Sequence, residues 1–368
     1  MPAAAGNVGV VNASVYDLRR LARTRMPKYV WDYVAGGAGE ETSVRANREA
    51  FRRTALVPRV LVDVSHRDTR TTALGTEVAA PLGIAPTSYH MLAHPDGELA
   101  TARAAGACGV LNIVSVFSSM TLEDVAKAAT GPLWFQLYCL RDRELTRSLI
   151  QRAEAAGYRA IVLGVDLPVI GYRDRDIRNR FGLPPEVSPV NLPPDLVGDG
   201  AELTELNRVL VSPDLTWRDV EWIRDVTELP VVVKGILAPE DALRAARIGV
   251  QGVLVSNHGG RQVDGAVATL NALPRVVDAI GGECEVYLDG GVRRGTDVLK
   301  ALAYGARMAF AGRPVMWALS AGGEEGVRAA LEMYLTELDL AMATCGCPDV
   351  SSIGPHLLDE GRTRWTRS

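Results

Sequence analysis

From residue 80 onward, the chain alternates between short apolar runs and longer segments of mixed polarity. The short runs are rich in β-branched and other apolar residues and are too short for helices, which predicts buried strands. The eight predicted strands are Pro81–Pro86, Val110–Val116, Leu133–Tyr138, Ala160–Asp166, Pro230–Lys234, Gly252–Ser256, Glu285–Asp289 and Met308–Gly312.

Between most of these runs, apolar residues recur with the spacing of an amphipathic helix. Strand–helix alternation is typical of parallel strands joined by crossover helices. Eight such units over roughly 235 residues suit an α/β protein with a (β/α)8 TIM barrel, which usually has about 250 residues. A doubly wound sheet would need a glycine-rich fingerprint after its first strand, and the sequence has none there. The predicted helices are Glu98–Cys108, Leu122–Ala129, Leu145–Ala156, Pro239–Ile248, Leu270–Ile280 and Gly295–Tyr304.

Residues 1–79 lack strand alternation and are predicted to form an N-terminal helical cap. Ser14 is a suitable N-cap for a helix over Val15–Arg25, and Pro27 opens a second helix over Tyr29–Val34. A glycine-rich break then precedes a third helix within Glu40–Arg53.

A single domain is expected over residues 1–368, with the barrel over residues 80–320 and a C-terminal helix and tail over residues 321–368. The tail contains a long amphipathic segment, Gly326–Ala343, which we expect to pack on the outside of the barrel. Residues 181–213, after the fourth strand, are rich in Pro, Asp and Gly and have little periodicity, which predicts a lid-like loop.

The composition of the 368 residues is typical of a globular enzyme, with 47% hydrophobic and 23% charged residues. A net charge of -4, with scattered Lys and Arg, gives no electrostatic reason to expect a nucleic-acid partner. The cysteines include only one close pair, Cys345 and Cys347, so we expect reduced thiols and a cytoplasmic location. No run reaches the roughly 18 to 20 apolar residues of a membrane helix, and residues 1–11 lack the basic start of a signal peptide, so no membrane partner is expected.

Polar residues follow the ends of the predicted strands, where the catalytic groups of (β/α)8 barrels lie. The clearest case is the segment 256–262, which places His258 and Arg261 in a glycine-rich turn after the sixth strand. An imidazole can accept a proton near neutral pH, and a guanidinium can hold an anion with paired donors. A histidine beside glycines is more often structural, but polar residues at the other strand ends favour a site. Those residues are Thr87, Ser88, Ser115, Gln136, Tyr138, Asp166, Arg173, Lys234 and Asp289.

The seventh and eighth strands end in segments suited to phosphate. The loops at these positions bind phosphate in many barrels, through glycine amides and a helix N-terminus. Gly291 and Gly312 allow close approach of the backbone, while Arg293 and Arg313 can add charge-assisted hydrogen bonds. Two ordinary tight turns are the alternative interpretation, and the occurrence of both segments together favours phosphate.

Charged residues at other strand ends suggest further roles. Lys234 ends a buried run, where a lysine is costly unless it is paired, so it is expected to meet an electron-rich group of a ligand. Asp166 could pair with His258 and stabilise its protonated form. Arg173 and Arg261 could together hold a carboxylate, although a surface salt bridge is the default interpretation for each arginine alone.

Several motifs resemble those of the FMN-dependent 2-hydroxy-acid oxidases and dehydrogenases, the family of glycolate oxidase, lactate oxidase and mandelate dehydrogenase. The resemblance extends from about Tyr16 to Cys347 and is closest to the hydroxymandelate oxidases. The motifs are Asp32-Tyr33, Ala46-Asn47-Arg48, Ile84-Ala85-Pro86-Thr87, His94-Pro95, Phe135-Gln136-Leu137-Tyr138, Val233-Lys234-Gly235, Ser256-Asn257-His258-Gly259-Gly260-Arg261-Gln262, the segment from Leu288 to Asp297 and Gly312-Arg313-Pro314.

The resemblance implies a bound FMN and two sets of residues around it. The phosphate would be held by Gly291, Arg293, Gly312 and Arg313. The ring and the ribityl chain would be contacted by Thr87, Ser88, Ser115, Gln136, Lys234, Ser256 and Asp289.

The resemblance also implies the roles of the residues around the substrate. Tyr33, Arg173 and Arg261 would bind the substrate carboxylate, and Tyr138 would meet the substrate hydroxyl. His258 would take a proton, and Asp166 would stabilise the resulting imidazolium.

The sequence departs from the family pattern at three positions. Phe117 stands where glycolate oxidases have tryptophan, Gly164 where a threonine is frequent, and Ser88 where alanine or glycine is more usual. Ser88 is expected to influence the access of dioxygen, and the missing side chain at Gly164 to free space under the flavin. No metal site is expected, because His90 and His94 lie in a loop next to a proline.

The activity implied by the resemblance is oxidation of an L-2-hydroxy acid, aromatic or of medium size such as mandelate, to the 2-oxo acid. Dioxygen would reoxidise the flavin and give hydrogen peroxide, and the family's usual assembly would make the protein a homotetramer or octamer. The alternatives are a dehydrogenase with a non-oxygen acceptor, a monooxygenase that decarboxylates the product, an FMN-dependent isomerase of phosphorylated substrates and a non-catalytic FMN-binding module. The Pro- and Asp-rich loop favours an oxidase, because the membrane-bound dehydrogenases of the family carry an apolar insertion there.

Overall fold

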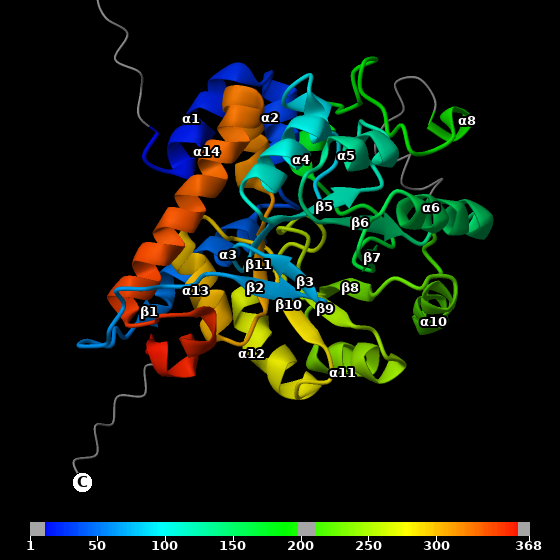
Figure 1. Cartoon of the computed structure of the whole chain (residues 1–368). Helices are drawn as coiled ribbons and strands as arrows, with labels where there is room; N and C mark the ends of the chain where they lie inside the picture. The colour runs from blue at the N-terminus through cyan, green and yellow to red at the C-terminus, as the bar shows by residue number, and fades with distance from the viewer. Residues whose placement is uncertain (1–11, 198–210, 360–368) are drawn as a thin grey trace, which may run out of the picture.

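The computed structural model describes residues 12–197 and 211–359, and its centre is a closed barrel of parallel strands (Figure 1). The strands follow one another around the barrel in the order β10-β11-β4-β5-β6-β7-β8-β9. Each strand overlaps one of the eight predicted runs, and only β8 extends beyond its run, by two residues, so the predicted (β/α)8 barrel is confirmed. The strands are β4 (Leu82–Ile84), β5 (Leu111–Ser115), β6 (Leu133–Tyr138), β7 (Ile161–Gly164), β8 (Val231–Ile236), β9 (Gly252–Val255), β10 (Glu285–Leu288) and β11 (Met308–Ala311).

Helices connect the strands and surround the barrel, as crossover connections between parallel strands require. Their buried faces are rich in Ala, Leu, Ile and Val, and the six predicted helices agree with the observed ones to within two residues at either end. Thr216 and Asp219 form a capping box at the start of α10. The helices are α4 (Gly97–Ala107), α5 (Leu122–Ala128), α6 (Arg143–Ala155), α10 (Trp217–Asp225), α11 (Pro239–Ile248), α12 (Thr269–Ile280) and α13 (Gly295–Ala303).

The interior of the barrel is filled by large side chains from its strands. Trp134 of β6 is fully buried, with its ring 5.3 Å from that of Tyr287 and 6.2 Å from that of Phe310. Leu111 and Leu254 belong to the same cluster. Because this packing leaves no open channel, ligands can be bound only at an end of the barrel.

The N-terminal segment forms α1 (Val15–Arg25), α2 (Lys28–Ala35) and α3 (Thr42–Arg53), close to the predicted limits. Ser14 caps α1 through a capping box with Asp17. Figure 1 shows α1 and α2 beside the C-terminal helix α14 (Arg313–Cys345), with α3 near the helices α12 and α13.

The prediction that residues 1–79 contain no strands is wrong at two places. The short strand β1 (Ala55–Leu56) pairs with β12 (Leu358–Asp359), near the other end of the chain. The strands β2 (Thr71–Ala73) and β3 (Thr76–Val78) form a hairpin whose Ala73 and Val78 pack against the barrel's interior cluster. Strands of two or three residues are too short to show an alternating pattern, which explains why the sequence did not reveal them.

The C-terminal helix is longer than the predicted Gly326–Ala343. The helix α14 begins directly after β11 and is broken at Gly322 and Gly323, where the backbone is not helical. The helix as a whole packs against α1, α4 and α13, and Arg25 of α1 donates to the backbone oxygen of Ala321, just before the break. Within the described ranges, no helix is long and apolar enough to cross a membrane.

The segment after β7 contains two short helices, α7 (Asp174–Arg178) and α8 (Pro194–Val197). At the start of the predicted lid-like loop, Phe181 is buried and its ring stacks on Tyr33 of α2, with 4.4 Å between the ring centroids. Residues 198–210 of that loop lie outside the described residues. The stacking of Phe181 on Tyr33 anchors the described part of the loop to the N-terminal cap.

The first prediction concerns the aromatic cluster inside the barrel. Trp134→Ala should lower the free energy of unfolding by about 3–5 kcal/mol, since it leaves a cavity beside Tyr287 and Phe310. Trp134→Phe is the matched control, because it keeps an aromatic ring and removes an indole N–H that has no hydrogen-bond partner among the described residues. Urea unfolding of both variants tests this prediction, and equal losses of stability would contradict it.

Candidate active site

A cavity opens at the carboxyl ends of the barrel strands, and residues from all eight strand ends contribute to its wall. Of the site residues predicted from the sequence, only Asp166 and Ser256 are absent from the wall, and both lie directly behind it in contact with His258. The predicted residues that line the cavity are Tyr33, Thr87, Ser88, Ser115, Gln136, Tyr138, Arg173, Lys234, His258, Arg261, Asp289, Gly291, Arg293, Gly312 and Arg313.

His258 is held by its backbone and by its ring. Its φ of 55° places it in the left-handed region, and its backbone N–H donates to Ser256 Oγ at 3.1 Å. Its Nδ1 lies 3.1 Å from both carboxylate oxygens of Asp166. Nδ1 therefore carries a proton, which leaves Nε2 as the free acceptor of a neutral ring.

The environment keeps this imidazole neutral and the carboxylate ionised. Burial lowers the pKa of His258 to about 4, and the nearby Lys234 acts in the same direction, against the opposing effect of Asp166. Burial opposes ionisation of Asp166, but Lys234 and His258 hold the pKa of that carboxyl well below its usual range. At neutral pH, the pair is a neutral base beside a permanent anion.

Lys234 lies between two carboxylates at the end of β8. Its Nζ is 3.5 Å from Asp166 Oδ2 and 4.0 Å from Asp289 Oδ2, and its side chain is buried. Although burial disfavours its charge, the two carboxylates raise the pKa of Lys234 above the usual value. Burial raises the pKa of Asp289, whose Oδ1 has no hydrogen-bond partner among the described residues.

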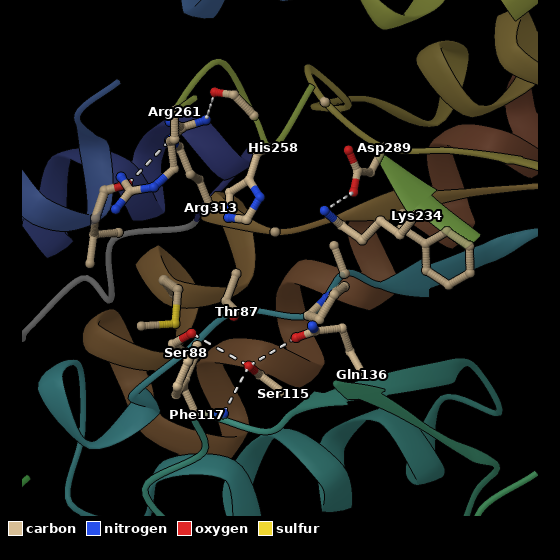
Figure 2. A pocket seen from close by; sticks show the side chains of 18 of the residues that line it. Thr87, Ser88, Ser115, Phe117, Gln136, Lys234, His258, Arg261, Asp289 and Arg313 are labelled. Atoms are coloured by element: carbon tan, nitrogen blue, oxygen red, sulfur yellow. Dashed lines mark hydrogen bonds and ion pairs between the residues drawn. The ribbon is translucent and has the colours of Figure 1, made fainter. Parts of the chain in front are cut away.

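A hydroxyl network forms the opposite side of the cavity (Figure 2). Ser115 Oγ donates to Gln136 Oε1 at 3.1 Å, accepts from the backbone N–H of Phe117 at 3.2 Å and lies 3.4 Å from Ser88 Oγ. These bonds fix the Gln136 amide so that its buried Nε2 has no acceptor within the described structure. A buried donor and a buried acceptor, Gln136 Nε2 and Asp289 Oδ1, thus remain open to a ligand.

Two guanidinium groups lie together on another part of the wall. Arg261 donates from Nη1 to the backbone oxygens of Tyr33 at 2.6 Å and Gly36 at 3.0 Å, and its Cζ lies 4.8 Å from the Tyr33 ring. Burial and the nearby Arg261 lower the pKa of Arg173 to about 10. Arg173 has one distant carboxylate partner, Asp176, at 3.9 Å. The pair can accept a small anion such as a carboxylate.

The loops after β10 and β11 form a further part of the cavity wall. Gly291 has a φ of +98°, and a side chain there would lie 2.6 Å from the backbone oxygen of Asn47. Arg313 donates to the backbone oxygens of Val34 at 3.1 Å, Gly36 at 2.6 Å and Gly259 at 2.8 Å. Arg313 therefore ties the N-terminal cap to the barrel, a role that the sequence did not suggest.

The same part of the wall has an excess of positive charge. Burial lowers the pKa values of both Arg293 and Arg313, and nearby arginines act in the same direction. Neither guanidinium has a carboxylate partner within hydrogen-bond distance among the described residues. The helix α14 begins at Arg313, so its N-terminal amides add positive potential. This combination suits a phosphate group.

Comparison with known proteins identifies the family. The model of the FMN-dependent dehydrogenase family matches residues 22–360. The chain belongs to the FMN-dependent dehydrogenases. It is 45% identical to an L-lactate oxidase of Nostoc sp. over 356 residues, which cover 94% of this chain and 97% of that protein. A peroxisomal (S)-2-hydroxy-acid oxidase of Oryza sativa subsp. japonica is also 45% identical, over 352 residues that cover 95% of this chain and 96% of the relative.

Solved structures give the same result. A crystal structure of mandelate oxidase with (S)-4-hydroxymandelic acid superposes with a TM-score of 0.90 at 44% sequence identity, covering 95% of this chain and 98% of that one. The family resemblance and the cofactor FMN, both expected from the sequence, are therefore confirmed.

The residues around the cavity of this FMN-dependent dehydrogenase fit the cofactor independently of the comparisons. FMN carries ring carbonyls that accept hydrogen bonds, ribityl hydroxyls that donate them, and a dianionic phosphate. The open donor of Gln136, the open acceptor of Asp289 and the positive end at Arg293 match these three kinds of group. We infer that the cofactor extends from the hydroxyl network to the loops after β10 and β11.

The structure corrects one expectation from the sequence. A side chain at Gly164 would lie 2.5 Å from Cε1 of Tyr138, so the missing side chain makes room for the tyrosine ring and leaves no empty space. At Phe117, the second departure, the ring centroid lies 5.7 Å from that of Tyr138 and 6.2 Å from that of Tyr89.

Both ring nitrogens of His90 lie within hydrogen-bond distance of hydroxyl groups, those of Thr87 and Thr101.

Several lining residues were not predicted from the sequence. Tyr89, Leu167, Ile170 and Met316 add aromatic and apolar surface to the cavity. Leu167 and Ile170 follow the fourth predicted strand, so the strand-end rule could have found them. Tyr89 and Met316 lie on short or helical segments and gave no signal of their own.

The second prediction concerns Gly291. Gly291→Ala should weaken FMN binding by about tenfold or more, because a left-handed backbone and a contact with Asn47 both oppose the added methyl group. Gly157→Ala is the control, since Gly157 has a φ of +88° but no atom within 4 Å of the added group. Fluorescence titration of the apoproteins with FMN measures both affinities. Equal effects of the two variants would contradict a special role for Gly291.

Proposed function

We propose that this protein oxidises an (S)-2-hydroxy acid to the corresponding 2-oxo acid and passes the electrons to dioxygen, giving hydrogen peroxide. The observation that carries the proposal is the buried His258–Asp166 pair beside two guanidinium groups in the cavity of an FMN-dependent dehydrogenase. The relatives named as L-lactate oxidase, (S)-2-hydroxy-acid oxidase and mandelate oxidase support it.

The substrate carboxylate is bound by Arg173 and Arg261, with Tyr33 beside them. These groups line the same part of the cavity, and the two cations lack a close carboxylate partner among the described residues. An incoming carboxylate supplies the missing negative charge and forms charge-assisted hydrogen bonds. This binding fixes the position of the substrate's α-carbon.

Proton transfer is assigned to His258. Because its pKa is about 4, the ring is neutral at neutral pH and its Nε2 can accept a proton from the substrate. Asp166 holds Nδ1–H and stabilises the imidazolium that forms. When bound, FMN would supply a two-electron acceptor that dioxygen can reoxidise.

Tyr138 is the proposed contact for the substrate hydroxyl. Burial raises the pKa of Tyr138 far above its usual value, and the charge of Asp166 adds to this effect. The phenol is therefore neutral and can donate a hydrogen bond to an oxygen of the substrate.

The FMN contacts are proposed as the sequence suggested them. Thr87 and Ser88 face the cavity from the loop after β4, and Ser115 and Gln136 face it from β5 and β6. Lys234 and Asp289 face it from the other side (Figure 2). The buried ammonium of Lys234 offers positive charge to the electron-rich part of the cofactor. Ser256 does not line the cavity; its Oγ accepts a hydrogen bond from the backbone N–H of His258 and so helps to position that residue. The proposed phosphate contacts are Gly291, Arg293, Gly312 and Arg313.

An aromatic or medium-sized substrate such as mandelate is proposed. Tyr89, Phe117, Leu167, Ile170 and Met316 give the cavity apolar and aromatic surface that glycolate, with its single methylene group, could not fill. The similarity to mandelate oxidase structures supports the same substrate class.

The assembly and the compartment are proposed from the family resemblance. We expect a homotetramer or octamer in the cytoplasm. All five cysteines are free thiols, which suits a reducing compartment.

A visible-spectrum titration tests the substrate and the acceptor together. Under anaerobic conditions, (S)-mandelate should bleach the flavin band faster than L-lactate or glycolate, and (R)-mandelate serves as the control. Air should then restore the colour with release of hydrogen peroxide. Faster bleaching by glycolate or lactate would refute the aromatic substrate class. Recovery of the flavin band only after addition of a quinone would identify a dehydrogenase. Oxygen uptake without release of hydrogen peroxide would identify a monooxygenase.

The role of His258 gives a separate prediction. His258→Ala should lower kcat/KM by about 10²–10⁴-fold, because general base catalysis is lost. FMN should remain bound, since the ring forms only part of the wall. His66→Ala, on the exposed surface, is the control and should leave kcat/KM unchanged. Full activity of His258→Ala would refute the proposed base.

A further inference from the structure

A second hollow, of about 840 Å³, lies outside the flavin cavity between the N-terminal helices α1 and α3 and the C-terminal helix α14. It shares only Arg293 and Arg313 with the wall of the flavin cavity. Ligand sites usually have volumes of about 300–1,000 Å³, so the hollow is large enough for a molecule and not only for an ion.

Arginines dominate the wall of this hollow. Five of them come from α1 and α3, whereas Glu49 and Asp359 are the only carboxylates among its described lining residues. Glu49 pairs with Arg53 at 2.9 Å. The five arginines are Arg19, Arg45, Arg48, Arg52 and Arg53.

The arginines of α3 follow the spacing of one helix face. Arg45, Arg48 and Arg52 are three and four residues apart, and like charges at this spacing destabilise a helix. Within the described part of the chain, Arg45 bonds to the backbone oxygen of Glu40 and to Thr42 Oγ1, and neither Arg45 nor Arg52 has a carboxylate partner there. The arrangement therefore favours an external anion over a structural role.

Two donors in the wall also lack acceptors. Arg48 pairs with Asp297 at 2.7 Å, but its buried Nε has no partner among the described residues. The indole N–H of Trp317 is likewise unpartnered, although the side chain is only 3% exposed. Trp317 lies between two cations, with Arg19 Cζ at 5.6 Å and Arg293 Cζ at 4.9 Å from its ring. Buried donors without acceptors are an independent sign of a ligand.

We propose that this hollow binds a nucleotide-sized polyphosphate anion, at a site distinct from the FMN site. Guanidinium groups match the geometry of phosphate oxygens with paired donors, and several of them can engage a chain of phosphates. The partly exposed rings of Tyr16 and Tyr304 line the same hollow and offer surface to a heterocyclic base. The volume, the charge and the rings together assign a nucleoside polyphosphate.

Calorimetric titration of the full-length, FMN-loaded protein with ADP and with inorganic pyrophosphate tests this proposal at constant ionic strength. Both should bind saturably, ADP more tightly, with the flavin spectrum unchanged. The double variant Arg45→Gln/Arg52→Gln should bind ADP about tenfold or more weakly, because it loses two charge-assisted contacts. Arg218→Gln, an exposed arginine of α10 outside the hollow, is the control and should bind as the unmodified protein does.

The outcomes are distinguishable. Release of FMN by ADP would mean that the anion enters the flavin site, and this would overturn the proposal. Equal weakening in Arg218→Gln, or absence of saturable binding, would also overturn it. Equal affinities for ADP and pyrophosphate would refute the nucleotide and leave a free polyphosphate. The test needs no turnover, so its result does not depend on the proposed oxidation.

Discussion

The active site depends on a buried cluster of charges in which Asp166 lies between His258 and Lys234, and Lys234 also faces Asp289. Removing any one member would leave another charge buried without its partner, which is far more costly than the absence of the whole cluster. The cluster therefore fixes the relative positions of β7, β8, β9 and β10. It also sets the chemistry, because the same charges that keep Asp166 ionised keep His258 neutral.

A second constraint acts between the barrel and the N-terminal cap. Arg261 and Arg313 both donate to backbone oxygens at the end of α2, and Tyr33 of that helix lines the cavity. Phe181, from the segment after α7, stacks on the same tyrosine. The carboxylate-binding part of the site is thus built jointly by the cap and by the loops after two strands. A (β/α)8 barrel without its cap would lack this wall.

Much of this could be predicted from the sequence, because parallel strands are buried on both faces and appear as continuous apolar runs. The same rule placed His258, Lys234 and Asp289 at one end of the barrel, since strand ends determine where side chains meet. The family and FMN came from the resemblance. Properties that depend on distant segments were not visible. The pairing of Ala55 with Asp359, the bonds from Arg313 to the cap and the contact between Gly164 and Tyr138 all join residues far apart in the sequence or across strands.

The break at Gly322 and Gly323 divides α14 into two segments, and the residues that follow the second segment return to the N-terminal part of the chain. There α14 packs along α1, and β12 pairs with β1. Residues near both ends of the described chain therefore pack together on the outside of the barrel. In terms of protein engineering, truncation into α1 or into β12 would remove one partner from these contacts, so both segments must be kept in a shortened protein.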